Sequence, residues 1–229
     1  MKQPSKSLVL FDIDGTLMRG AGPHHIAALI EGIRKVTGHS TNLDGIPTAG
    51  KLDRDLIVSM LVAEGATQGE IKSQLPSIMR ECQSSYISNC STDLAPFVCR
   101  GVREKLAELA SAGAVLALVT GNLSEIGWKK VELAGLKSYF STGAFAEDGR
   151  TRARLAQIAW RRAQRAGLVT RNCRISLIGD HANDIAAAKA NDYQSVAVAS
   201  GVLSYDELAK EEPDILIRHM DELDLSRVL

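Results

Sequence analysis

Short apolar runs alternate with helical repeats along most of the chain. Five runs are almost continuously apolar, at residues 7–11, 114–120, 175–179, 195–200 and 214–218. Strands of this kind are expected where helices cover both faces of a parallel sheet. Between two of them, Val102, Leu106 and Leu109 share one face of a helix that ends at Gly113. The alternation predicts an α/β fold with a doubly wound, Rossmann-like parallel sheet.

The segment from residue 19 to residue 93 departs from this alternation, because it shows helical repeats without convincing strands. Apolar residues recur at helical spacing in two stretches: Ile26, Leu29, Ile30 and Ile33, then Leu56, Ile57, Met60 and Leu61. A capping box of Thr67 and Glu70 opens a third helix, which Pro76 should kink or divide. We therefore expect a helical cap at residues 19–93, inserted into an α/β core made of residues 1–18 and 94–229.

Composition narrows the possible partners and the compartment. Lys plus Arg and Asp plus Glu both number 27 in 229 residues, and aromatic residues make up only 4%, so nucleic acid binding is not expected. No apolar stretch is long enough for a bilayer, and the N-terminus does not resemble a secretory signal. The four cysteines form no Cys-x-x-Cys pair. We therefore predict a cytoplasmic protein with reduced thiols. We expect it to bind neither membranes nor nucleic acids.

The first apolar run stops at two carboxylates, in the stretch "DIDGT" at residues 12–16. In open α/β sheets, ligands bind beyond the carboxyl ends of the strands, which is where Asp12 and Asp14 should lie. The alternative is an ordinary turn at Asp14 and Gly15 with both carboxylates solvated. A hairpin turn needs a second alternating strand, and residues 17–25 do not supply one. The two carboxylates are therefore candidates for a site.

Two further strand ends carry polar groups. One run ends in Thr120, Gly121 and Asn122, and another in "GDHAND" with Asp180 and Asp184. Taken singly, the first triplet is a common turn and the second a pair of helix-initiating acids. Taken together, oxygens clustered at strand tips suit Mg²⁺, which binds a few carboxylates along with substrate phosphate oxygens and water. An aspartate free to attack phosphorus would form an aspartyl phosphate.

These motifs resemble those of the haloacid dehalogenase superfamily, especially phosphoglycolate-phosphatase-like and β-phosphoglucomutase-like members with a helical cap. "DIDGT" is similar to the first family motif, "VTGN" to the second and "GDHAND" to the fourth, and residues 201–223 are similar to the usual ending. The resemblance covers nearly the whole chain. It implies a Mg²⁺-dependent phosphatase that hydrolyses a small phosphorylated metabolite through an aspartyl-phosphate intermediate.

The resemblance also implies roles for individual residues. Asp12 would be the nucleophile and a metal ligand. Asp14 would protonate the leaving oxygen and then activate water, while its backbone carbonyl binds the metal. Thr120 and the Gly121 amide would hold phosphoryl oxygens, and Asp180 would complete the metal ligands. Supporting positions are Asp184 at the metal, with Thr16 and Asn122 at the phosphate.

The third family motif departs from the usual pattern. A lysine before a proline is expected there, whereas this chain has "EDGRTRARLAQIA". Arg152, at the start of a predicted helix, is the candidate for the missing cation, and Arg154 is the second choice. Arginine keeps its charge and can bridge two oxygens, so the replacement is chemically reasonable. The alternative for Arg152 is a solvated arginine at a helix end.

The expected cap offers further charged residues. Relatives place a substrate-reading loop where this chain has residues 48–55, so Lys51 is a candidate contact for a second anionic group on the substrate. An exposed lysine is its ordinary alternative. His24 and His25 could face the site from the cap hinge, or could serve surface or capping roles.

Several other functions share parts of this residue set. A phosphonate hydrolase of the same superfamily would use a cap lysine such as Lys51 to form a Schiff base. Neither a phosphonate hydrolase nor a dehalogenase would be expected to have the acid at position 14, and Asp14 is present here. A signalling receiver domain carries its phosphorylated aspartate after a later strand and has no helical cap. The complete set of acidic motifs argues against a non-catalytic phospho-ligand binding protein. The sequence does not distinguish a phosphatase from a phosphomutase, and it does not identify the leaving group or the oligomeric state.

Overall fold

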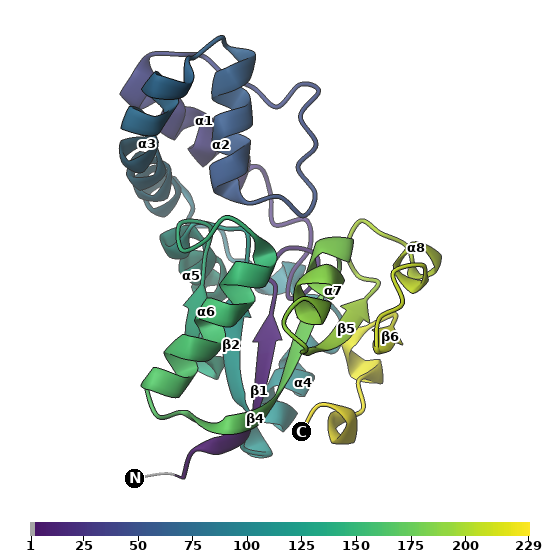
Figure 1. Ribbon diagram of the computed structural model, residues 1–229. Helices are drawn as coiled ribbons and strands as arrows, with labels where there is room; N and C mark the ends of the chain where they lie inside the picture. The colour runs from purple at the N-terminus through teal and green to yellow at the C-terminus, as the bar shows by residue number, and fades with distance from the viewer. Residues whose placement is uncertain (1–2) are drawn as a thin grey trace.

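The computed structural model describes residues 3–229 and shows a sheet between two layers of helices, with three further helices beyond one end of its strands (Figure 1). The first two residues of the expected core segment 1–18 lie outside this described part. Six parallel strands follow the order β3-β2-β1-β4-β5-β6. Their bounds are β1 Ser5–Phe11, β2 Val115–Val119, β3 Phe140–Ala144, β4 Val169–Gly179, β5 Gln194–Val198 and β6 Ile215–Ile217. The predicted doubly wound α/β fold is confirmed.

The direction of the chain across the sheet changes next to β1. From β1 the chain adds β2 and β3 on one side, then crosses to β4 on the other side and continues to β5 and β6. A crevice therefore opens beyond the carboxyl ends of β1 and β4, where connecting loops leave in opposite directions. Because β2, β1 and β4 are neighbours, the three polar strand ends found in the sequence lie side by side.

Two strands differ from the sequence expectation. β3, "FSTGA", was not predicted, because its Ser, Thr and Gly residues give no apolar run; it forms the sheet edge beside β2. β4 begins at Val169 instead of residue 175. Its first residues are mostly polar and partly exposed, and Val169 pairs with Ser5. Pairing with a neighbouring strand, rather than hydrophobicity, extends the sheet in both places.

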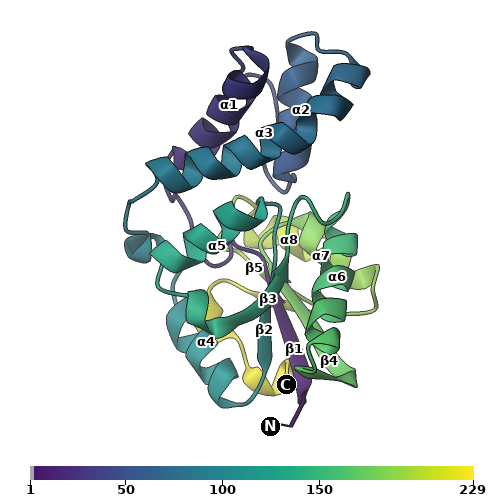
Figure 2. The same cartoon turned by 90° about the vertical axis from the view of Figure 1, so that its left-hand side faces the viewer.

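Helices cover both faces of the sheet (Figure 2). α6 (Arg152–Arg165) and α7 (Ala182–Lys189) lie over one face, and α4 (Val102–Ser111) and α5 (Ser124–Leu133) lie over the other. α8 (Tyr205–Ala209) lies beside β6. In β1, Leu8 and Leu10 belong to one core cluster, whereas Val9 and Phe11 belong to the opposite one. This burial on both faces explains the continuous apolar run at 7–11.

The three helices of residues 19–93, called here the three-helix segment, are α1 (His24–Thr37), α2 (Asp53–Ala63) and α3 (Gln68–Asn89). They lie beyond the carboxyl ends of the strands (Figures 1 and 2). The predicted capping box of Thr67 and Glu70 is present, but α3 continues through Pro76, so the expected division of this helix is wrong. Its apolar stripe packs on α1 and α2 along both halves, which favours one continuous helix.

Among residues 3–229, none of the helices combines the length and apolarity needed to cross a bilayer.

Helices α1 and α3 pack very closely at Gly32. A Cβ atom at this position would lie 2.5 Å from Sγ and 2.6 Å from the backbone nitrogen of Cys82. Backbone atoms cannot rotate away as a side-chain end can, so only glycine fits here without movement of a helix. By contrast, a Cβ atom at Gly69 in α3 would meet no atom closer than 4.0 Å.

Gly32→Ala should therefore destabilise the protein, although alanine is the better helix former. Overpacking costs about 1–3 kcal/mol, which exceeds the gain of about 1 kcal/mol in helix propensity. Urea unfolding of both variants measures the difference, with Gly69→Ala as the matched control that should be neutral or slightly stabilising. Equal effects of the two substitutions would contradict the close packing of α1 on α3.

Candidate active site

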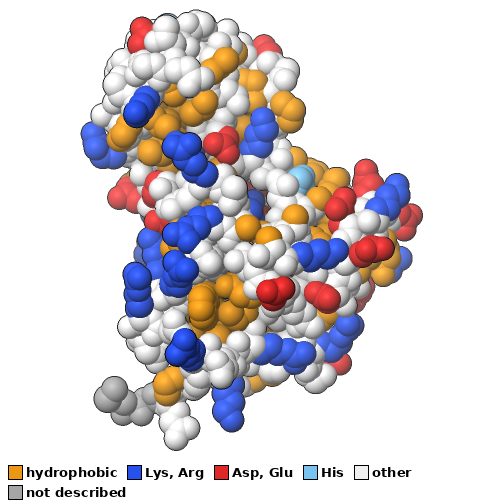
Figure 3. All heavy atoms as spheres, in the orientation of Figure 1, with side chains coloured by type: hydrophobic (Ala, Val, Ile, Leu, Met, Phe, Trp, Pro, Cys, Tyr) orange, Lys and Arg blue, Asp and Glu red, His pale blue; other side chains and the backbone are white. Residues whose placement is uncertain are grey.

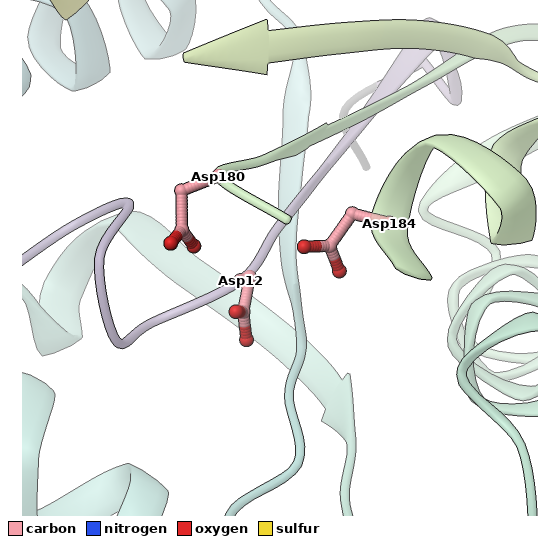
Figure 4. A group of neighbouring side chains, drawn as sticks. All are labelled: Asp12, Asp180 and Asp184. Atoms are coloured by element: carbon pink, nitrogen blue, oxygen red, sulfur yellow. The ribbon is translucent and has the colours of Figure 1, made fainter. Parts of the chain in front are cut away.

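Three carboxylates converge at the carboxyl ends of the central strands (Figure 4). Asp12 follows β1, Asp180 follows β4, and Asp184 lies in the first turn of α7. Each is at most 5% exposed, and one oxygen from each lies within 4.8 Å of the others. Strand order thus brings together two motifs that are far apart in the sequence.

Arg152, the first residue of α6, balances part of this negative charge. Its Nη1 atom donates hydrogen bonds to Asp12 Oδ1 at 2.8 Å and to the Val119 carbonyl oxygen at 3.2 Å. Its Nε atom lies 3.3 Å from Asp184 Oδ1. Arg154 is exposed and contacts Gln157 instead. Of the two arginines considered from the sequence, the structure brings only Arg152 to the carboxylates.

Two members of the cluster, Asp180 and Asp184, have raised pKa values. Burial, reinforced by the charge of Asp12, raises the pKa of Asp180 to about 7. Burial also raises the pKa of Asp184 well above its usual range, against the opposing charge of Arg152. Carboxyl groups with raised pKa values release their protons when a metal cation binds to them. The cluster therefore has the properties of a cation site as well as an ion pair with Arg152.

Asp14 faces away from this cluster and has its own cation. Lys130 of α5 donates to both Asp14 carboxylate oxygens at 2.7 Å, and Asn122 Nδ2 donates to Oδ2 at 2.7 Å. Burial by itself would raise the pKa of Asp14, but the charge of Lys130 and the hydrogen bonds from Lys130 and Asn122 outweigh this effect and lower the pKa to about 2. The two acids of "DIDGT" thus pair with different cations, Asp12 with Arg152 and Asp14 with Lys130.

The loop after β2 supplies polar groups between these two environments. Thr120 is fully buried, and its hydroxyl accepts a hydrogen bond from Asn122 Nδ2 at 2.7 Å. Gly121 lies against the three-helix segment, where an added Cβ atom would come within 2.4 Å of the Lys51 carbonyl oxygen. Asn122 therefore links Thr120 to Asp14, and residue 121 must be small for the two parts of the chain to meet.

A cavity of about 290 Å³ lies between the strand ends and the three-helix segment. Asp12, Asp14 and Thr120 line its sheet side, and His25 and Lys51 line it from the three-helix segment. In the space-filling view, the molecule narrows at this level (Figure 3). A small ligand in the cavity would contact both parts of the chain.

Some candidates lie at the cavity and others do not. Asp180, Arg152, Gly121 and Asn122 also line it. Thr16, expected at the phosphate, is instead fully buried and donates to Asp180 Oδ1 at 3.1 Å. Lys51 is exposed at the cavity edge. His24 contacts Thr92, whereas His25 contacts Asp53 and Lys130.

The sequence interpretation missed two residues of this region, Lys130 and Asp53. Lys130 follows the buried Ile126 by four positions on α5, so it lies on the apolar face, where a lysine is rare without a partner. That spacing was a usable signal. Asp53 lies in the stretch 48–55, in which only Lys51 was considered, and its contacts depend on how the three-helix segment packs on the strand ends.

The donor set of the acidic cluster fits a hard divalent cation. Asp12, Asp180 and Asp184 offer only oxygen atoms, as Mg²⁺ and similar ions require. Asp184 Oδ1 is buried and has no hydrogen-bond partner, although Arg152 is near it. An unsatisfied buried oxygen in a cluster with two other carboxylates is consistent with cation binding.

Comparison with known proteins agrees with this geometry. A family model described as haloacid dehalogenase-like hydrolase matches residues 6–192. A phosphoglycolate phosphatase from Vibrio vulnificus is 25% identical over 97% of this chain and 96% of its own. The β-phosphoglucomutase structure from Clostridium difficile has a TM-score of 0.65 at 17% identity, over 97% of this chain and 95% of its own. A haloacid dehalogenase-like family hydrolase from Streptococcus pneumoniae has a TM-score of 0.63 at 16% identity, over 97% and 98%.

Arg152→Ala should destabilise the folded protein strongly in chelator-containing buffer. It removes the cation that faces Asp12 and Asp184, and breaking a buried ion pair costs about 3–5 kcal/mol. Arg154→Ala is the matched control on the same helix turn and should change stability by less than about 0.5 kcal/mol. Chemical denaturation of the two variants provides the comparison. A loss at Arg154 as large as that at Arg152 would refute this assignment of the ion pair.

Proposed function

The chain belongs to the haloacid dehalogenase-like hydrolases and is a phosphatase-type enzyme of that family, and we propose that it hydrolyses a small phosphorylated metabolite with Mg²⁺. One observation carries the proposal. Asp12 lies at the cavity, in contact with the Arg152 guanidinium and close to two further carboxylates, Asp180 and Asp184. This arrangement suits a nucleophile that must approach an anionic phosphate.

The first chemical step forms an aspartyl phosphate. A carboxylate oxygen of Asp12 attacks phosphorus in line with the leaving oxygen, and the bond from phosphorus to that oxygen breaks. Asp14, which is ionised beside Lys130 in the unliganded protein, must first take up a proton from the solvent; it then gives this proton to the leaving oxygen, so an alcohol departs. The two side chains leave the same short turn but lie in different surroundings, which suits them for separate roles.

The second step returns the enzyme to its starting state. Asp14, now a carboxylate, accepts a proton from a water molecule as the water oxygen attacks phosphorus. The acyl phosphate bond breaks, inorganic phosphate leaves, and Asp12 is a carboxylate again. Release of inorganic phosphate, rather than transfer to a sugar or other acceptor, distinguishes this cycle from that of a phosphomutase.

Mg²⁺ would be held by the side chains of Asp12 and Asp180 and the backbone carbonyl of Asp14, with Asp184 supporting the set. The bound ion supplies charge neutralisation between the anionic nucleophile and the anionic phosphate. Thr16 supports this arrangement through its hydrogen bond to Asp180. We therefore assign Thr16 to the metal side and not to phosphate binding.

Hydrogen-bond donors near Asp12 would stabilise the remaining negative charge on the phosphoryl oxygens. Arg152 already contacts Asp12 and can reach a phosphoryl oxygen beside it, as an arginine fork does at paired oxygens. The Thr120 hydroxyl and the Gly121 amide provide further donors at the end of β2. Preorganised donors of this kind stabilise charge that develops in the transition state.

We propose that residues 19–93 act as a cap over a core of residues 1–18 and 94–229. The cap forms one wall of the cavity and so contacts the leaving group. Lys51, exposed at the edge, is placed to attract a second anionic group on the substrate. The relative named phosphoglycolate phosphatase supports a small phosphorylated acid as the first substrate to test.

Mg²⁺ should stabilise the protein even without substrate. Binding at about 100 times its dissociation constant adds about 2.7 kcal/mol, equivalent to a rise of about 5–10 °C in melting temperature for a chain of this size. Asp180→Asn should lose most of the rise, whereas Asp206→Asn on the exposed start of α8 should keep it. Phosphate release from an aryl phosphate should stop in a chelator. Turnover that survives exhaustive metal removal would exclude Mg²⁺ dependence.

Replacing the two acids of "DIDGT" should stop the cycle at different steps. Asp12→Asn removes the nucleophile, so no phosphoenzyme should form. Asp14→Asn keeps the nucleophile, and an aryl phosphate needs little protonation of its leaving group, so the intermediate should form and then hydrolyse slowly. Mass spectrometry of quenched reactions should find one added phosphoryl group on Asp12 in Asp14→Asn alone. A phosphoryl group on another residue, or near-normal turnover by Asp12→Asn, would rule out this mechanism.

A further inference from the structure

A chain of four charged or polar side chains runs from the three-helix segment to Asp14. Asp53, the first residue of α2, contacts His25 of α1, His25 contacts Lys130 of α5, and Lys130 contacts Asp14. Two of these residues belong to residues 19–93 and two do not. The distances along the chain are 2.9, 3.1 and 2.7 Å, so each contact is direct.

Lys130 uses every donor that it has in this arrangement. An ammonium group has three N–H donors and no acceptor. In Lys130 these reach both carboxylate oxygens of Asp14 and Nδ1 of His25. Its side chain is only 3% exposed, so water cannot replace a lost partner freely. The position of the Lys130 ammonium therefore depends on both Asp14 and His25.

The hydrogen-bond directions follow from that requirement. Because Lys130 can only donate, Nδ1 of His25 must accept, and the ring proton lies on Nε2. Nε2 then donates to Asp53 Oδ2 at 2.9 Å. The same Asp53 oxygen accepts the backbone N–H of Leu123 at 2.8 Å, at the N-terminus of α5. Asp53 thus fixes His25 and the start of the helix that carries Lys130.

Asp53 reaches this position only when the three-helix segment lies on the strand ends. Its backbone N–H donates to the Gly121 carbonyl oxygen at 2.8 Å, and its side chain is 3% exposed. Asn183 of α7 holds the same loop by donating to the Gly50 carbonyl oxygen at 2.8 Å. The contacts that orient His25 are therefore contacts between the two parts of the chain.

We propose that Lys130 is a positioning residue for Asp14, and that Asp53 and His25 of the three-helix segment hold Lys130 in place. The inference rests on the proposed proton-transferring role of Asp14. It goes beyond that role because it makes the orientation of Asp14 depend on contact between the cap and the core.

The test compares two probes with different demands on Asp14. p-Nitrophenyl phosphate loses its leaving group without a proton, whereas phenyl phosphate has a poorer leaving group that needs one. Rapid quench and mass spectrometry give the rate of phosphoenzyme formation from each probe with Mg²⁺. K130M should lower the phenyl phosphate rate by about 10- to 100-fold, the effect of a misplaced catalytic group, and change the p-nitrophenyl phosphate rate little.

Matched variants separate positioning from a general loss of structure. K129M alters the neighbouring, more exposed lysine of α5 and should leave both rates unchanged, while K130R keeps the charge and should recover part of the lost ratio. D53N should shift the ratio of the two rates in the same direction as K130M, whereas D55N, on the exposed side of α2, should not. The double variant K130M/D53N should show the same ratio as K130M, because Asp53 acts through Lys130.

An unchanged ratio of the two rates in K130M would overturn the inference, even if both rates fell together. A ratio in the double variant well beyond that of K130M would overturn the part assigned to Asp53. If the unsubstituted protein forms phosphoenzyme from neither probe, the proposed function fails, and the positioning role fails with it. A normal phosphoenzyme in the unsubstituted protein with an unchanged K130M ratio would refute the positioning role alone.

Discussion

Repulsion among three buried carboxylates is the constraint around which this site is arranged. Two like charges about 4 Å apart in a protein repel by about 4 kcal/mol at an effective dielectric constant of about 20. One oxygen each of Asp12, Asp180 and Asp184 lies within 4.8 Å of the others, a similar separation, and the three side chains are almost fully buried. Such a cluster persists only if cations or protons offset its charge. Arg152 offsets part of this charge, while burial first, and then the neighbouring carboxylates, raise the pKa values of Asp180 and Asp184.

The same constraint separates the two acids of the first turn. Asp14 could not share the cluster without adding a fourth charge, and it turns instead toward Lys130 and Asn122. The result is one carboxylate beside an arginine and other acids, and a second beside a lysine. Pairs of titratable groups whose surroundings differ in this way suit different chemical roles. The division of work proposed for Asp12 and Asp14 rests on the family resemblance, and their different partners are consistent with it.

The three-helix segment both covers the cavity and contributes a charged residue, Asp53, to the contacts beside Asp14. Its residues line one wall of the cavity, and Asp53 enters a buried position at the start of α5. A buried carboxylate is stable only with hydrogen-bond donors around it, and here the donors come from both parts of the chain. Contact between the two parts and order at Asp14 are therefore supported by the same hydrogen bonds.

The sequence by itself determined the fold class, three helices in residues 19–93 and the polar strand ends, because apolar periodicity and strand-end motifs are local patterns. Arg152 could be placed ahead of Arg154 from its position at a helix start, but its contact with Asp12 depends on the geometry of α6 against β1. The edge strand β3, the unbroken α3 and the burial of Thr16 were decided by packing with distant segments. Lys130 and Asp53 belong to this second group. Their partners lie 116 and 28 residues away in the chain, so only the folded structure shows that their charges are paired.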